Sequence, residues 1–335
     1  MTGNTHTLPD SWSALTWDEL RRCWGVKMRY GGDADVARVA ALLMLVCGEE
    51  TSARVLQEDG RTGETVYVLT DANGRQWKTT ARELAFMAEK GLKWFDYPYG
   101  DPGEDAVKDG NGKVIKESRP AVRGYVSAMR DAMALPEEYV KMGRRWFALP
   151  QVAGSNLTWQ QYRSLQAIAP RLFAAGQNDS LIALLQAQFL AHILVPRSFA
   201  LFDTAGGSIK VRPHHEYRYD MARADELVRW WEKRLADDEN AAVLFHICFQ
   251  VYQTALTYYA AVYPMLFSGD GGKADPLRDA LTGEVGTVNT VMKYAGYSEQ
   301  QQVYDSNLPF VFDILNTMTK EAKEIERVNA RIKKK

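Results

Sequence analysis

The pattern of apolar and polar positions predicts helices along most of this chain. From Leu20 to Met28 apolar residues recur three and four positions apart, and the apolar run VARVAALLMLV follows a Gly-rich turn. The same order returns after Leu157, where a periodic stretch and the turn AAGQND lead into the apolar run SLIALLQAQFLAHILV. Three-four spacing is typical of an amphipathic helix, and a long apolar run is typical of a buried one. Both stretches therefore predict helical hairpins.

Each predicted hairpin begins with the phrase Leu-Thr-Trp. Thr16 can cap its helix together with Glu19, and Thr158 can do the same with Gln161. In such a capping box each side chain bonds to the backbone amide of the other residue. We expect the two phrases to open equivalent hairpins of a repeated module. The alternative is two independent capping boxes.

The segment between the two hairpins has a different pattern. Apolar and polar residues alternate around Asn73-Gly74, which predicts a β-hairpin because both residues tolerate positive φ. A helix from about Thr80 to Lys90 should follow, and residues 97–120 indicate an exposed loop or a second hairpin. The sequence predicts a mainly α fold, with helical hairpins and a small β-hairpin insertion between two helical parts.

This change of pattern also suggests a division into domains. Residues 1–120 should form an N-terminal part that contains a helical hairpin, the small β-hairpin, one further helix and an exposed loop. Residues 121–335 should begin with a short strand at RRWFALP and continue as a mainly helical domain. A chain of 335 residues is long for one core, which is consistent with two units.

Composition and charge narrow the possible functions. The formal net charge is -1, which argues against nucleic acid or an acidic membrane as a partner. Cys23, Cys47 and Cys248 lie far apart, which fits no disulfide framework and no zinc-ligand spacing and favours a reducing compartment. Residues 241–267 approach the length of a membrane span, but His246 and Gln250 favour a buried core helix.

No residue pattern predicts catalysis. The strongest candidate is the loop with His214, His215 and Glu216, but adjacent histidines diverge on a strand and on a helix and so converge poorly on one metal ion. No dinucleotide fingerprint, kinase motif set or serine-centred elbow occurs. We expect a non-enzymatic protein without metal or cofactor. The alternatives are a metal-dependent enzyme that uses this loop and a nucleic-acid-binding module whose basic groups gather only in the fold.

The C-terminal segment has the most regular pattern in the chain. Apolar residues recur there at alternating steps of three and four, which is the seam of a coiled coil. The positions on this seam are Leu308, Val311, Leu315, Met318, Ala322, Ile325, Asn329 and Ile332. The residues expected to bind a partner helix, or another copy of the chain, are Met318, Ile325, Asn329 and Ile332. The alternative is that the first half packs on its own domain and the lysine-rich end lies unpacked in solvent.

Two stretches carry a resemblance to a known family. Residues 288–315, VNTVMKYAGYSEQQQVYDSNLPFVFDIL, resemble small helical proteins of tailed-phage and prophage tail modules, including tail-assembly chaperones. The opening LPDSWSALTWDEL is similar to phrases in prophage tail-region proteins of gut Bacteroidetes. The resemblance implies a structural or assembly factor of a phage particle that acts through helical surfaces. It also implies phage components or self-association as partners, with a location in the bacterial cytoplasm or on the virion. The chain is longer than a typical chaperone of this kind, and residues 64–120 have no counterpart.

Overall fold

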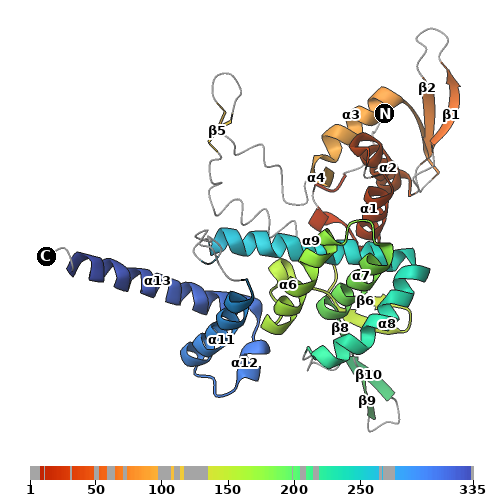
Figure 1. Cartoon of the computed structure of the whole chain (residues 1–335). Coiled ribbons are helices and arrows are strands. Elements are labelled where there is room, and N and C mark those ends of the chain that lie inside the picture. Colours follow the sequence, from red (N-terminus) through yellow and green to blue (C-terminus); the bar gives the residue numbers. More distant parts are fainter. Residues whose placement is uncertain are drawn as a thin grey trace. The chain divides into compact units, whose positions relative to one another are not determined.

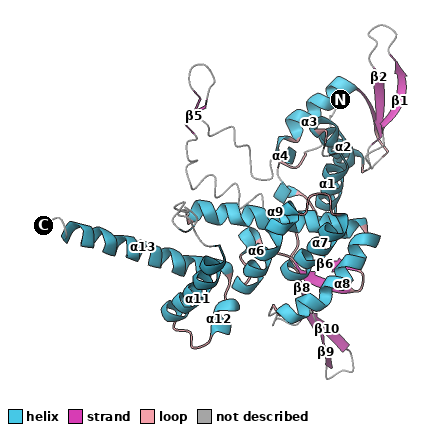
Figure 2. Ribbon diagram, in the orientation of Figure 1, coloured by secondary structure: helices cyan, strands magenta, loops and turns pink. Residues whose placement is uncertain are grey.

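The fold is mainly helical, with small antiparallel sheets, as the sequence predicts (Figure 1; Figure 2). We use a computed structural model of the chain. The backbone is described for residues 8–10, 12–30, 32–48, 53–58, 65–70, 74–96, 107–108, 114–116, 135–197, 199–203, 209–213, 219–263, 266 and 276–332.

The chain divides into two compact units. The first consists of Met1–Glu137 together with Ala242–Ile247, and the second of Glu138–Ala241 together with Cys248–Lys335. The first unit therefore includes a short stretch of a helix that otherwise belongs to the second.

The first unit contains a helical hairpin, further short helices and small sheets. Its helices are η1 (Trp12–Ala14), α1 (Trp17–Tyr30), α2 (Ala34–Cys47), α3 (Ala81–Gly91) and α4 (Lys93–Asp96). Its strands are β1 (Ala53–Glu58), β2 (Thr65–Thr70), β3 (Gln76–Thr80), β4 (Val107–Lys108) and β5 (Val114–Lys116). Strands β1, β2 and β3 form one antiparallel sheet, and β4 pairs with β5. The predicted hairpin around Gly74 is thus β2–β3, extended by β1.

Aromatic rings form the centre of the first unit's core. Trp12 is 4% exposed, and its ring lies 5.2 Å from Trp24, 5.1 Å from Trp94 and 5.3 Å from Phe95 between centroids. Lys27 lies over three of these rings and donates to the Phe95 carbonyl at 2.9 Å. Aromatic side chains bury large apolar areas, so this cluster joins η1 and α1 to α4.

The second unit is built from helices that pack on a small sheet and on one another. Its strands are β6 (Tyr139–Met142), β7 (Arg145–Ala148), β8 (Val195–Arg197), β9 (Phe199–Asp203) and β10 (Ile209–Pro213). Its helices are η2 (Val152–Gly154), α6 (Trp159–Ala174), α7 (Asp179–Ile193), α8 (Met221–Asp237), α9 (Glu239–Val262, shared with the first unit), α11 (Pro276–Ala295), α12 (Gln300–Tyr304) and α13 (Leu308–Ile332).

The strands after α7 differ from the mostly helical prediction for this part of the chain. Strand β8 pairs antiparallel with β7, and β9 pairs with β10 as a hairpin. Helix α7 ends at Ile193, two residues before β8 begins, and Pro196 lies within β8 opposite Phe147. Proline cannot donate in a helix, so the segment continues as an edge strand, where a missing amide costs little.

The two Leu-Thr-Trp phrases form the predicted capping boxes. The Thr16 amide donates to the Glu19 carboxylate at 2.8 Å, and the Glu19 amide donates back to the Thr16 hydroxyl at 3.3 Å. Thr158 and Gln161 make the same reciprocal pair at 3.0 and 3.2 Å. The hairpins that follow are α1–α2 and α6–α7. Whether they form a true structural repeat stays a prediction.

The tryptophans after the two threonines are buried to different extents. Trp17 is only partly buried against the core of the first unit, whereas Trp159 is 6% exposed in the core of the second. Trp159 also contacts Tyr162 and Phe312, at centroid distances of 5.2 and 6.0 Å. Packing around the two phrases is therefore not the same, although the caps are.

We expect Thr158→Ala to lower the free energy of unfolding by about 1 kcal/mol, because the Gln161 amide at the start of α6 loses its acceptor. Thr158→Ser keeps the hydroxyl and should remain close to the unmutated protein. Urea denaturation followed by circular dichroism measures both. Equal destabilisation by the two substitutions would assign the effect to the lost methyl group and not to the cap.

Candidate functional site

The start of helix α13 is anchored in the core of the second unit. Leu308, Val311 and Phe312 are 1%, 0% and 3% exposed. The Phe312 ring lies 5.5 Å from Tyr162 on α6 and 4.8 Å from Tyr259 on α9 between centroids. This first part of α13 therefore packs on its own unit.

Two tyrosines tie the middle of α13 to neighbouring helices. The Tyr263 hydroxyl, just after α9, donates to the Asp313 carboxylate at 2.5 Å. Burial, followed by this hydrogen bond, raises the pKa of Tyr263 above its ordinary value. The Tyr294 hydroxyl on α11 donates to Glu321 at 2.7 Å. Among the described side chains, Glu321 is the last residue of α13 that hydrogen-bonds to another helix.

Beyond Thr319, α13 has an exposed surface on all sides. Figure 1 shows the C-terminal half of α13 continuing past α11. From Lys320 to Ile332 every side chain that the structure describes is exposed. An α-helix rises 1.5 Å per residue, so this segment extends for about 20 Å. It is long enough to offer a partner three or more turns.

The exposed segment carries an apolar stripe. Ile325 is 61% exposed, Val328 44% and Ile332 66%. At 100° per residue these side chains lie within about 60° of one another on the helix. We call these three residues the distal stripe. Contiguous exposed apolar residues of this kind are typical of protein interaction sites.

The predicted partner-binding residues lie on or beside this stripe. Ile325 and Ile332 belong to it, Asn329 is exposed next to it, and Met318 is partly buried nearer the anchored half. The heptad pattern did not include Val328, because the alternating three-four steps place Asn329 there instead. The spacing of Ile325, Val328 and Ile332 was the signal that could have found it. Partner binding by these residues stays a prediction.

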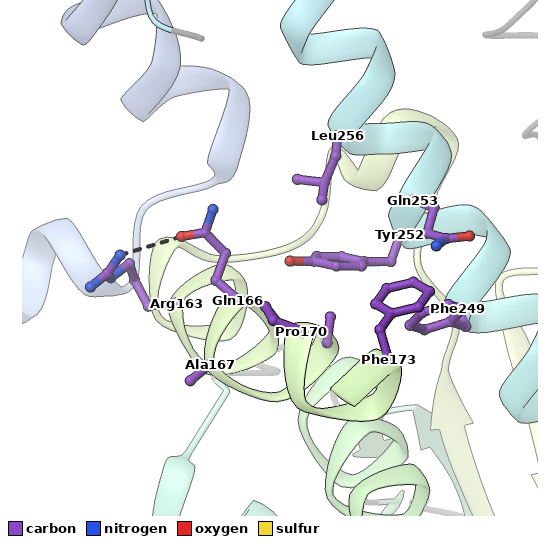
Figure 3. A pocket seen from close by; sticks show the side chains of 10 residues that line it. Arg163, Gln166, Ala167, Pro170, Phe173, Phe249, Tyr252, Gln253 and Leu256 are labelled. Atoms are coloured by element: carbon purple, nitrogen blue, oxygen red, sulfur yellow. Dashed lines mark hydrogen bonds between the residues drawn. The ribbon is translucent and has the colours of Figure 1, made fainter. Parts of the chain in front are cut away.

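A groove between α6 and α9 is a second surface feature of the second unit. It encloses about 480 Å³, within the range of small-ligand sites. Figure 3 shows the rings of Phe173 and Phe249 close together, with centroids 5.7 Å apart. Phe173 is 70% exposed. Two aromatic rings therefore form part of the wall of the groove.

Polar groups lie at one end of this groove. The Gln166 side chain donates to the Tyr162 hydroxyl and accepts from Arg163 at 3.3 Å, and Arg163 pairs with Glu284 on α11 at 3.1 Å. Tyr252 is 2% exposed, and its hydroxyl points into the groove (Figure 3). Burial raises the pKa of Tyr252 above its ordinary value. The structure gives this hydroxyl no hydrogen-bond partner among the residues it describes.

A buried polar cluster links α7 to the start of α8. His192 Nδ1 bonds to the Tyr219 hydroxyl, which lies 3.4 Å from the Ser164 hydroxyl, and His192 Nε2 lies 3.5 Å from the Asp225 carboxylate. Burial lowers the pKa of His192, opposed by Asp225, and raises the pKa of Tyr219 to about 12. Both shifts favour neutral side chains, so the arrangement fits a structural link better than an activated nucleophile.

The metal-site alternative depends on the loop with His214, His215 and Glu216, which lies outside the described residues. Among the residues that are described, no three His, Cys, Asp or Glu side chains gather closely enough to hold a metal ion. Cys23, Cys47 and Cys248 are buried and form no disulfide bond. Burial raises the pKa of Cys23 to about 12 and also raises that of Cys248.

Helix α9 contains most of residues 241–267, the segment whose length approaches a membrane span. It runs from Glu239 to Val262 as a largely buried helix. Within the described ranges, no helix is both long enough and apolar enough to cross a bilayer.

The chain was compared with family models, curated proteins and solved structures. None of the three comparisons gave a match.

We expect Tyr252→Phe to change the free energy of unfolding by less than about 0.5 kcal/mol, because its hydroxyl has no partner among the described residues. Tyr263→Phe should lower it by roughly 1 kcal/mol, since the exposed Asp313 carboxylate loses a buried donor. Chemical denaturation of the two variants compares them directly. A larger loss for Tyr252→Phe would contradict the geometry of the groove.

We also expect stability to fall as the pH drops below about 6.5, partly through His192. Its pKa is lower in the folded protein, so the unfolded chain takes up a proton first, and folding is penalised below the unfolded value. His192→Gln should make the decline in unfolding free energy between pH 7.5 and 5 shallower. His246, whose pKa burial also lowers, remains in that variant, so part of the decline should persist. An unchanged slope would show that His192 titrates normally in the fold.

Proposed function

We propose that the protein is a non-enzymatic structural or assembly factor of a phage or prophage particle, related to its tail. It acts through protein–protein contacts made by helices, either in the cytoplasm of the bacterial host or on the particle. The observation that carries this proposal is the distal stripe on α13. The setting in a phage tail comes from the resemblance of residues 288–315 and of the opening phrase.

The division of α13 into two halves supports a binding role. In its first half Leu308, Val311 and Phe312 are buried in the core of the second unit. This anchoring fixes where the exposed second half starts. Fully burying one Ile side chain contributes about 1.5 to 3 kcal/mol. Ile325 and Ile332 are exposed, so burying them against an apolar partner surface would contribute this free energy to binding.

The charge pattern around the stripe suits recognition by a helix or groove. Lys323 and Arg327 lie on the opposite face of the helix from Ile325, at about 160° in either direction. An apolar seam with charged sides is the arrangement by which amphipathic helices enter partner grooves or pair with other helices. The proposed partners are accordingly other particle components or a second copy of the chain.

We expect Ile325→Gln with Ile332→Gln to weaken partner binding roughly tenfold or more, because the apolar contacts at both ends of the stripe are lost. The fold should stay cooperative, since both side chains are exposed. The matched control is Lys323→Gln with Arg327→Gln on the opposite face. Titration calorimetry against the protein products of adjacent tail genes measures the affinity.

The biological test is removal of the gene from the phage or prophage genome that carries it. We expect particles without functional tails by electron microscopy, rescued by the unmutated gene and by the control variant but not by the Ile325/Ile332 variant. Normal particles after the deletion would overturn the proposed function. A gene neighbourhood of metabolic enzymes would also count against it.

A further inference from the structure

A groove in the first unit lies between strand β3 and helix α3. It encloses about 470 Å³, and the strand side of its wall consists of Trp77, Lys78 and Thr79. Neighbouring residues of a strand point to opposite faces of a sheet. A groove lined by three consecutive strand residues therefore lies along the edge of the strand and not on one face of the sheet. We call it the edge groove.

Strand β3 has an edge that no described strand covers. The sheet order is β1-β2-β3, so β3 pairs with β2 on one side only. The Thr80 amide donates to the Glu83 carboxylate at 2.9 Å and is thus turned away from β2. Backbone groups alternate in direction along an antiparallel strand, so the N–H and C=O groups of Gln76 and Lys78 also point away from β2. These groups are the donors and acceptors that an added strand would pair with.

Helix α3 contributes exposed apolar side chains to the edge groove. Phe86 is 60% exposed and Met87 39%, and both line the groove. The helix approaches the sheet face that carries Thr79, because the Thr79 hydroxyl donates to Glu83 at 3.2 Å. Trp77 lies on the same face, two residues earlier in the strand. A strand added to β3 would therefore place every second side chain against apolar groups.

Charge in the edge groove is predominantly positive. Lys78 and Arg82 line it, are exposed and form no ion pair with any other described residue. Glu83 is the acidic residue of the groove, and its carboxylate already accepts from the Thr80 amide and the Thr79 hydroxyl. Pairing with β3 of a second copy would bring like charges together, whereas acidic side chains across from Lys78 would be attracted.

We propose that the edge groove binds an extended peptide segment of a partner protein, in which apolar and acidic residues alternate, as a fourth strand beside β3. The apolar side chains of the peptide lie against Trp77, Phe86 and Met87, and the acidic side chains lie on the face of Lys78. In such strand addition, main-chain hydrogen bonds supply affinity and the alternate side chains supply specificity. The site lies in the first unit and depends neither on α13 nor on the proposed function.

Fluorescence anisotropy of labelled peptides with the full-length protein tests the side-chain preference. The probe is a fluorescein-labelled Val-Glu-Val-Glu-Val peptide with an amidated C-terminus, and the comparison peptide is Val-Lys-Val-Lys-Val. We expect the acidic peptide to bind at least roughly tenfold more tightly, because its charges oppose those of the groove. Equal affinities, or no saturable binding of the acidic peptide up to about 1 mM, would overturn the proposal.

Methylation of the peptide backbone tests strand addition itself. One version of the acidic peptide carries N-methyl groups on its valine amides, and the other carries them on its glutamate amides. In an added strand only one of these two sets of amides faces β3. We expect one methylated peptide to lose at least roughly tenfold in affinity and the other to bind nearly as the parent does, since only one loses its hydrogen bonds to the strand. Equal affinity of the two, whether high or low, would overturn strand addition.

Substitutions in the protein test the location of the site. Lys78→Glu with Arg82→Glu should reverse the preference, so that the lysine peptide binds more tightly than the acidic one. Lys233→Glu, at an exposed lysine of the second unit, is the matched control and should leave the preference unchanged. Phe86→Ala should weaken binding of the acidic peptide roughly tenfold, because an apolar contact is lost. A preference that survives the double charge reversal would place the peptide elsewhere and overturn the proposal.

A second copy of the chain is the competing occupant of the edge groove. We expect the unmutated chain to sediment in the same way with and without the acidic peptide. A dimer that the acidic peptide dissociates in analytical ultracentrifugation would overturn the proposal in favour of pairing between two β3 strands. None of these outcomes alters the test of the distal stripe, because the substitutions at Ile325 and Ile332 leave the edge groove intact.

Discussion

The C-terminal helices depend on a backbone contact between the first residues of α6 and α13. The Trp159 amide donates to the Ser306 carbonyl and the Leu308 amide donates to the Leu157 carbonyl, each at 2.8 Å. The first amides of a helix have no acceptor within the helix itself. Here a residue shortly before each helix supplies an acceptor for the first amide of the other helix, so the two starting points are fixed together. This joint fixes where α13 begins, and the bonds of Asp313 to Tyr263 and of Glu321 to Tyr294 hold its course beyond that point.

The side chains around the joint extend it into the core. Besides its place in the capping box, Gln161 donates through Nε2 to the His192 carbonyl at 3.0 Å, near the end of α7. Apolar contacts alone define the relative positions of helices loosely. A buried side-chain amide whose hydrogen bonds are satisfied restricts them to one arrangement. The beginnings of α6 and α13 and the end of α7 thus meet at one place. The partner-binding hypothesis depends on this joint between α6, α7 and α13, because the joint helps to determine which part of α13 is buried.

Elements with a strong local signal could be predicted from the sequence. The capping boxes at Thr16 and Thr158, the hairpin at Gly74 and the apolar helix α9 follow from residue chemistry within a few positions. Strand β8 could not be predicted in the same way, because its pairing with β7 joins segments about 50 residues apart. The fold class is confirmed, while the phage setting and the non-enzymatic role stay predictions.

The candidate site shows the same limit of local pattern. The heptad spacing indicated where α13 carries apolar residues. Only tertiary packing shows that Leu308, Val311 and Phe312 are already covered while Ile325 and Ile332 are not. The groove between α6 and α9 gave no sequence signal, because Phe173 and Phe249 come from helices far apart in the chain. The position of Val328 on the stripe likewise became evident from its exposure.

The distal half of α13 has a thermodynamic consequence for whatever covers it. Its backbone is helical, but no packing surface among the described residues supports it, so its helicity depends on intrinsic propensity and on the anchored turns before it. Binding and completion of the helix are then linked equilibria. A substitution such as Lys323→Gly, on a face that no partner touches, changes the helical population and thereby changes the apparent affinity of the stripe. One face of the helix therefore contacts the partner, while residues on the opposite face influence the affinity through the helical population.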